Sequence, residues 1–189
     1  MKHIAIFASG DGSNAENIIR YFAERPLSGK VELVICNRPG AGVIARAEAL
    51  GVPVRVMTRE EISDSDVMLR LLDDYHVDLI VLAGFLLMIP GFITSRYSGR
   101  IVNIHPSLLP AYGGKGMYGR RVHEAVIAAG EKVSGVTIHY VTDVYDEGRI
   151  IFQAETEVTP DDTPATLEAK VRALELAHFP RIIDGLPTF

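Results

Sequence analysis

The stretch HIAIFASGDGSNAENIIRYFA, residues 3–23, joins two kinds of secondary structure through a glycine-rich loop. Its first part is a short apolar run that predicts a buried strand over 3–8. Its last part repeats apolar residues at helical spacing, with Ile18 and Phe22 on one face, and predicts a helix over 14–23. A strand that feeds a helix through such a loop is typical of α/β proteins.

Working outward, the same alternation continues along the chain. Further strands are predicted over 31–36, 52–56, 79–82 and 100–104, and helices over 43–50 and 66–75. The pattern then changes, because strands over 135–143 and 149–158 are separated only by a turn, and a last helix opens with Thr163 and Pro164. We therefore expect an α/β fold in one domain over 1–189. Its single, doubly wound and mostly parallel sheet is flanked by helices and carries an antiparallel strand pair toward the C-terminus.

Composition limits the function classes. The 189 residues carry a formal net charge of −5, which argues against nucleic acid and anionic membranes as partners, while a small anionic substrate remains compatible. Cys36 is the only cysteine and has no zinc-type spacing around it, so we expect no metal site. No apolar run is long enough for a signal peptide or a membrane span. We expect a cytoplasmic protein that acts on small molecules, with its oligomeric state open.

The loop SGDGSNAE, residues 9–16, predicts a phosphate site at a helix start. Ser13 and Glu16 have the spacing of a capping box, and Gly12 lets a ligand approach the backbone closely. A dinucleotide fingerprint is the alternative, since Gly10, Gly12 and Ala15 satisfy it. That fingerprint also needs a carboxylate after the second strand, where this chain has Cys-Asn-Arg at 36–38.

The stretch IVNIHPSLLPAYGG, residues 101–114, places two polar groups at the end of a strand that we expect to be central and parallel. Asn103 and His105 are two residues apart, so they share one face of the strand. Pro106 favours extended backbone at His105 and starts a loop that cannot fold as helix. Ligands of open α/β sheets bind outside such strand ends, so this pair is a candidate catalytic centre.

A carboxylate beside His105 would favour its imidazolium form and fix its orientation. If alternation continues through the strand at 135–143, Asp143 shares a face with His139 and can approach His105. Asp146 and Glu147 are alternatives that the sequence does not separate. His139 itself is compatible either with lining the site or with packing.

Five segments together resemble phosphoribosylglycinamide formyltransferase, a folate-dependent enzyme family of purine synthesis. They are SGDGSN, DLIVLAGFL, VNIHPSLLP, GVTIHYVTDVYDEG and ALELAHFP, and they span residues 9–180. The resemblance implies formyl transfer from 10-formyltetrahydrofolate to the glycinamide amine, with the folate as co-substrate and no metal. It implies these site residues: Asn103, His105 and Asp143 as the catalytic set; Gly12, Ser13, Asn14 and Glu175 for the ribonucleotide; and Leu86, Leu87, Met88, Ile89 and Asn103 for the folate.

Two departures accompany the resemblance. Members of the family often carry Met-Arg-Ile where this chain has Leu-Leu-Met at 86–88, so the contact with the folate's glutamate tail is open. The loop 111–121 looks longer than usual and offers Lys115, Arg120 and Arg121 as other positive groups. The competing functions are another folate-dependent formyl transferase or hydrolase of the same superfamily, and a dinucleotide-binding oxidoreductase module.

Overall fold

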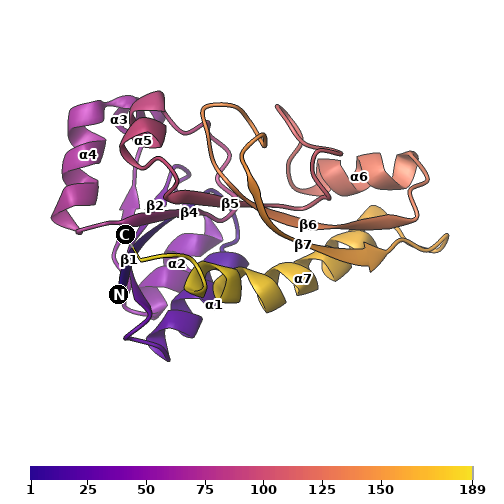
Figure 1. The fold of residues 1–189 in the computed structure, drawn as a ribbon, viewed down its shortest axis with the longest axis horizontal. Helices are drawn as coiled ribbons and strands as arrows, with labels where there is room; N and C mark the ends of the chain where they lie inside the picture. The colour runs from indigo at the N-terminus through magenta and orange to yellow at the C-terminus, as the bar shows by residue number, and fades with distance from the viewer. Residues whose placement is uncertain (189) are drawn as a thin grey trace.

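The structure, a computed structural model, describes residues 1–188 and contains one seven-stranded sheet with helices on both faces (Figure 1). The strands lie in the order β3-β2-β1-β4-β5-β6-β7. The strands are β1 Lys2–Ala8, β2 Gly29–Cys36, β3 Val54–Val56, β4 Leu79–Leu82, β5 Ile101–His105, β6 Val133–Tyr140 and β7 Ile150–Glu157. The helices are α1 Ser13–Ala23, α2 Gly42–Ala49, α3 Arg59–Ser63, α4 Ser65–Asp74, α5 Gly91–Arg96, α6 Arg120–Ala128 and α7 Pro164–Asp184.

The expected fold class is confirmed. The strands β1 to β5 pair in parallel, and β6 and β7 add an antiparallel edge. The Asn103 strand, β5, lies inside the sheet as expected, and it pairs in parallel with β4 and antiparallel with β6. This arrangement places β6 directly beside the Asn103 strand, and so brings a residue of β6 into the site.

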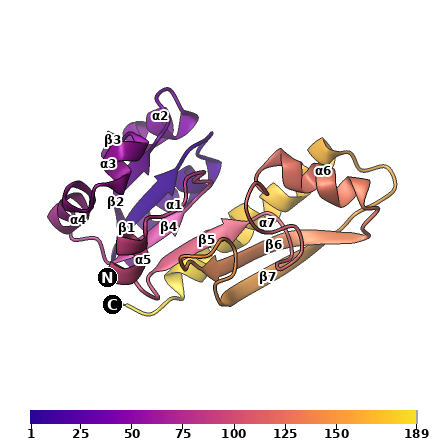
Figure 2. The same ribbon diagram turned by 90° about the horizontal axis from the view of Figure 1, so that it is seen from above.

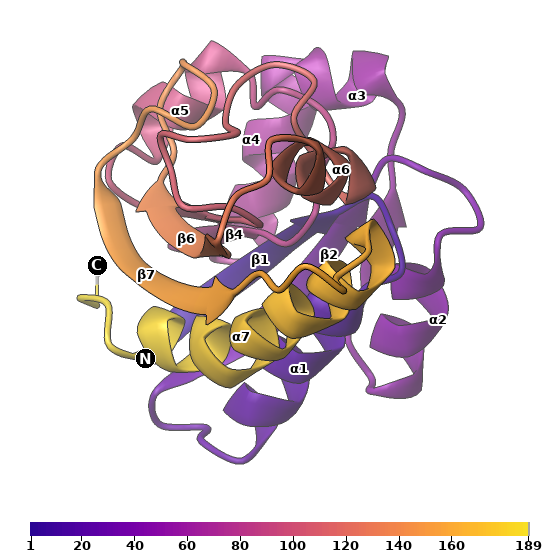
Figure 3. The ribbon, with the colours of Figure 1, turned by 90° about the vertical axis from the view of Figure 1, so that its right-hand side faces the viewer.

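Two apolar cores follow from the alternation of side chains along the central strands. In β1, Ile4 and Ile6 belong to the core under α1, α2 and α7, while Ala5 and Phe7 belong to the core under α3, α4 and α5. Figure 3 shows the two helix layers on opposite sides of β1. A strand buried on both faces explains why its sequence is an unbroken apolar run.

Several local predictions are corrected. Gly12, not Ser13, is the N-cap of α1, with a left-handed φ of 85°, and no side chain caps this helix. Glu16 bonds Arg20 and Arg46 instead of closing a capping box. Three helices, α3, α5 and α6, were not predicted; α3 and α5 have only 5 and 6 residues, too few to show a helical period. Among residues 1–188, no helix combines the length and apolarity needed to cross a membrane.

The strand order reverses direction between β1 and β4. Chain connections leave β1 toward β2 on one side and leave β4 toward β5 on the other, so the loops after β1 and β4 diverge at the carboxyl edge of the sheet. Such a switch point leaves a crevice in which ligands of open α/β sheets bind. Figure 2 shows α6 beside α7 at the end of the molecule away from the chain termini.

Candidate active site

A cavity of about 640 Å³ lies at this carboxyl edge. Its lining comes from the glycine loop after β1, the loop after β4, the end of β5, and helices α6 and α7. Its lining includes every predicted site residue except Asp143: the ribonucleotide set, the folate set, Asn103 and His105. The sequence thus identified most of one surface, although its members come from segments far apart in the chain.

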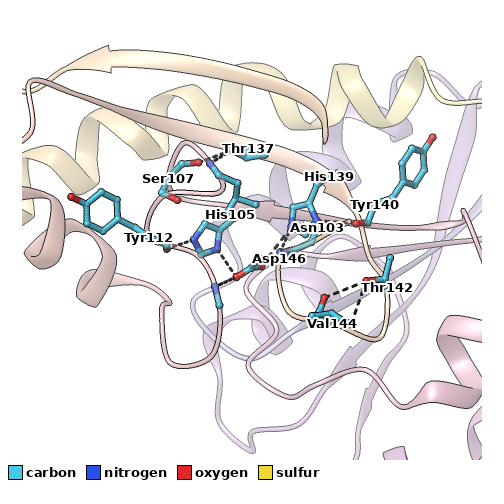
Figure 4. Close-up of polar contacts among 12 residues, drawn as sticks. Asn103, His105, Ser107, Tyr112, Thr137, His139, Tyr140, Thr142, Val144 and Asp146 are labelled. Atoms are coloured by element: carbon cyan, nitrogen blue, oxygen red, sulfur yellow. Dashed lines mark hydrogen bonds and ion pairs between the residues drawn. The ribbon is translucent and has the colours of Figure 1, made fainter. Parts of the chain in front are cut away.

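His105 ends β5 and is only 4% exposed. Its Nε2 lies 2.8 Å from the Tyr112 carbonyl oxygen, which can only accept, so Nε2 carries a hydrogen. Its Nδ1 lies 3.6 Å from Asp146 Oδ2 (Figure 4). The ring is therefore held by one nitrogen, and any proton that it exchanges in the cavity is exchanged at Nδ1.

The loop after β5 is what supplies the Tyr112 carbonyl. Thr137 on β6 anchors this loop, because its hydroxyl donates to Ser107 O at 2.7 Å and accepts from Leu109 N–H at 2.9 Å. Ser107 then donates to Ala111 O. Figure 4 shows the loop folding back toward His105. The prolines thus keep the loop from becoming helix, and Thr137 sets where it returns.

Asp146, and not Asp143, is the carboxylate beside His105. Asp143 is exposed and does not line the cavity. Strand β6 ends at Tyr140, and the next residues form a turn in which Thr142 Oγ1 and Val144 bond each other, so alternation does not continue to Asp143. The chain then brings Asp146 back with a left-handed φ of 56°, and Gly114 N–H donates to its Oδ2 at 2.8 Å.

Asn103 faces His139 across the antiparallel pair of β5 and β6. The His139 Nδ1 lies 2.9 Å from the Tyr140 carbonyl and so carries a hydrogen. Burial lowers the pKa of His139, which keeps the ring neutral at pH 7 and its Nε2 an acceptor. Asn103 Nδ2, at 3.1 Å, donates to that Nε2. The 3.6 Å contact between His139 Nε2 and Asp146 is then no ion pair.

The glycine loop presents backbone N–H groups at the start of α1. Asn14 does not add its amide nitrogen to them, because Asn14 Nδ2 donates to Glu175 Oε2 on α7 at 2.7 Å. Its Oδ1 is buried and has no partner within residues 1–188. Burial raises the pKa of Glu175, although the Asn14 hydrogen bond opposes this. The side chain of Asn14 thus offers the cavity an acceptor and adds no donor to the backbone N–H groups that suit a phosphate here.

The loop after β4 presents apolar side chains to the cavity. Leu86 and Met88 are 40% and 44% exposed and line the cavity, whereas only Ile89 is fully buried. Leu86 N–H donates to Ser9 Oγ, which ties this loop to the glycine loop. Within residues 1–188, the N–H groups of Leu87 and Met88 donate no hydrogen bond. The loop therefore offers both apolar surface and free backbone donors.

Comparison with known proteins gives a consistent result. Residues 2–183 match the family described as formyl transferase. The chain belongs to this formyl transferase family. It is 40% identical to a chloroplastic phosphoribosylglycinamide formyltransferase of Arabidopsis thaliana, over 98% of this chain and 65% of that protein. It is 37% identical to the phosphoribosylglycinamide formyltransferase of Bacillus subtilis (strain 168), over 98% and 95%.

Solved structures agree with the fold. A crystal structure of phosphoribosylglycinamide formyltransferase from Bacillus halodurans superimposes with a TM-score of 0.87 at 37% identity, covering 97% of this chain and 94% of that one. A glycinamide ribonucleotide transformylase 1 from Symbiobacterium toebii gives 0.88 at 34% identity, over 97% and 86%. The chain thus spans about two thirds of its plant relative and nearly all of several bacterial ones.

Sequence reasoning used four residues of the site only in part or not at all. Asp146 and His139 were considered but not assigned. Tyr112 acts through its carbonyl, which no side-chain pattern reveals. His123, on α6, lines the cavity although its helix was not predicted.

The positive groups of the long loop separate into two kinds. Lys115 and Arg121 line the cavity, and the Arg121 guanidinium lies 5.1 Å from the centre of the Tyr118 ring. Arg120 instead pairs with Glu124 on the surface of α6 at 3.3 Å. Of the three cations considered from sequence, two are thus placed where they can meet a bound anion.

Proposed function

We propose that the protein transfers the formyl group of 10-formyltetrahydrofolate to the amine of 5-phosphoribosylglycinamide, a step of purine biosynthesis. The observation that carries this proposal is the convergence of Asn103, His105 and Asp146 in one cavity. The relatives at 37–40% identity that bear this enzyme's name support it.

The chemistry is direct acyl transfer. The amine attacks the formyl carbon, a new C–N bond forms, and the carbonyl oxygen gains negative charge. The second N–H of Asn103 and a protonated His105 Nδ1 are the donors available to that oxygen. Collapse of the tetrahedral centre breaks the bond to folate N10 and returns the electron pair to that nitrogen.

Proton movement completes the balance. The attacking amine loses one proton, and the departing folate nitrogen gains one. His105 donates at Nδ1, because its Nε2–H is held by Tyr112. Asp146 lies 3.6 Å from Nδ1 and can receive the amine's proton through water and return it to the ring. No side-chain nucleophile is needed.

The two ends of the cavity suit the two substrates. At one end the backbone N–H groups of Gly12, Ser13 and Asn14, at the positive end of the α1 dipole, suit the ribonucleotide phosphate, and Glu175 suits the sugar. At the other end Leu87 and Met88 N–H suit the pterin, with Leu86 and Ile89 completing the folate loop. Cys36, the single cysteine, is buried and free, which fits a reducing compartment. We therefore place the protein in the cytoplasm.

A hydrolase of the same family is the second candidate, because water can take the amine's place beside Asp146. An oxidoreductase is disfavoured by the contact of Ser9 Oγ with Asn37, which occupies the position where a dinucleotide site needs a carboxylate.

The test is a turnover assay with identified products. The purified protein is mixed with 10-formyltetrahydrofolate, with and without 5-phosphoribosylglycinamide, and tetrahydrofolate release is followed by absorbance while the formylated ribonucleotide is detected by mass spectrometry. We expect turnover only with the ribonucleotide. Formate release without it identifies a hydrolase, and no turnover in either case overturns the proposal.

A further inference from the structure

Three buried side-chain atoms have no hydrogen-bond partner within residues 1–188: Asn14 Oδ1, His123 Nδ1 and Ser134 Oγ. Two of these residues, Asn14 and His123, line the cavity, while Ser134 on β6 does not. A buried polar atom left without a partner is unfavourable, because it has lost its hydrogen bonds to water and gained none in exchange. Such a cost inside a ligand cavity suggests that a ligand satisfies these atoms.

His123 is the less expected of the two. It projects from the first turns of α6, is only 2% exposed, and its ring makes no hydrogen bond within the described residues. Its electrostatic neighbours are Glu168 and Arg172 on α7 and His105 on β5. The ring therefore lies between the catalytic imidazole and the helix that carries Glu175.

The charges around His123 indicate what it can bind. Burial lowers the pKa of His123, so the ring is neutral and offers one N–H donor and one lone pair. Glu168 and Glu175 on α7 line the same cavity and can accept hydrogen bonds. A hydroxyl group can accept a hydrogen bond from an imidazole and donate one to a carboxylate. It therefore matches the imidazole and carboxylates found here.

We propose that His123 is a specificity residue that hydrogen-bonds a ribose hydroxyl of the ribonucleotide. The proposal rests on the function proposed above. It places the sugar between α6 and α7, with the phosphate at α1 and the amine at His105. Asn14, whose Oδ1 is the other buried atom without a partner in the cavity lining, could accept a hydrogen bond from a second hydroxyl of that sugar.

The test is a double-mutant cycle in which one change is made in the enzyme and the other in the substrate. His123→Phe removes both ring nitrogens at similar size, and His123→Asn keeps a polar atom near the position of Nδ1. KM and kcat are measured for the ribonucleotide and for its 2′-deoxy and 3′-deoxy analogues. We expect His123→Phe to raise the KM for the ribonucleotide roughly tenfold, as loss of one hydrogen bond does, with the folate KM unchanged. His123→Asn should recover part of this loss.

The analogues separate a contact from a general disturbance. If His123 bonds one hydroxyl, the analogue lacking it should bind wild type and His123→Phe equally well, so the two losses do not add. Ser134→Ala is the matched control, because it removes the orphan atom outside the cavity. Losses that add for both analogues, or an unchanged KM in both His123 variants, overturn the inference. Absence of formyl transfer by wild type would instead overturn the proposed function.

Discussion

Asp146 Oδ2 lies 3.6 Å from His105 Nδ1, and the same oxygen accepts a 2.8 Å hydrogen bond from Gly114 N–H. The backbone of the long loop after β5 thus fixes the carboxylate that faces the imidazole. The other ring nitrogen is fixed by the Tyr112 carbonyl of the same loop. One loop therefore orients both members of the proposed acid–base pair.

The choice of carboxylate is directly testable. Asp146→Asn keeps the shape but removes the charge beside His105 Nδ1. We expect kcat to fall by about a hundredfold or more, the usual cost of disabling one preorganised group of an acyl-transfer site. Asp143→Asn is the matched variant three residues earlier, on an exposed side chain, and should keep near-normal turnover. The reverse ranking of the two variants would restore Asp143 to the mechanism.

A second prediction concerns the pairing of Asn103 and His139. His139→Phe removes the acceptor that orients the Asn103 amide, so kcat should fall by roughly tenfold or more while both KM values stay nearly constant. His139→Gln restores an acceptor and should recover part of the rate. The double variant with Asn103→Ala should lose no more than Asn103→Ala alone, because His139 acts through Asn103. Fully additive losses would contradict this positioning role.

Stability should depend on pH through the two buried histidines. Burial lowers the pKa of both His123 and His139 below the unfolded value of 6.5. The unfolded chain then binds more protons as the pH falls below about 6.5, so this contribution to stability is complete above that pH and is lost toward the folded pKa values. Each histidine changes the free energy of unfolding by about 1.4 kcal/mol per unit of pKa difference.

The measurement is Tm against pH from 8 to 5. His123→Phe should show a shallower decline than wild type between pH 6.5 and 5, because one of the two groups no longer titrates. It should also match or exceed the wild-type Tm at pH 7, since a buried unpartnered nitrogen has been removed. Parallel curves for the two proteins would show that His123 does not contribute in this way.

The glycine loop needs a substitution that leaves the fold intact. A Cβ at Gly12 would lie 2.5 Å from Val43 Cα, and the φ of 85° is itself unfavourable, so changes there report on folding. A Cβ at Gly10 meets nothing within 4 Å. Gly10→Val should therefore fold normally and narrow the approach to the α1 N-terminus, raising the KM for the ribonucleotide far more than that for the folate. An equal rise in the KM values for both substrates would contradict a phosphate site at this loop.

Local sequence determined the parts of the site that lie along single elements. The spacing of Asn103 and His105 placed both on one face at the end of β5, because side chains alternate with period two in any strand. The glycine loop was likewise evident, since a strand, a tight turn and a helix follow one another within a few residues. The fold class followed from the alternation of strands and helices.

Tertiary structure alone decided which groups meet from different elements. His139 faces Asn103 because of the β5–β6 register, and Asp146 replaces Asp143 because β6 ends at Tyr140 and a turn redirects the chain. His123 reaches the cavity because α6 packs against α7. Periodicity encodes which side chains share a face of one element. It does not encode strand register, turn geometry or helix packing, which depend on contacts between residues distant in the chain.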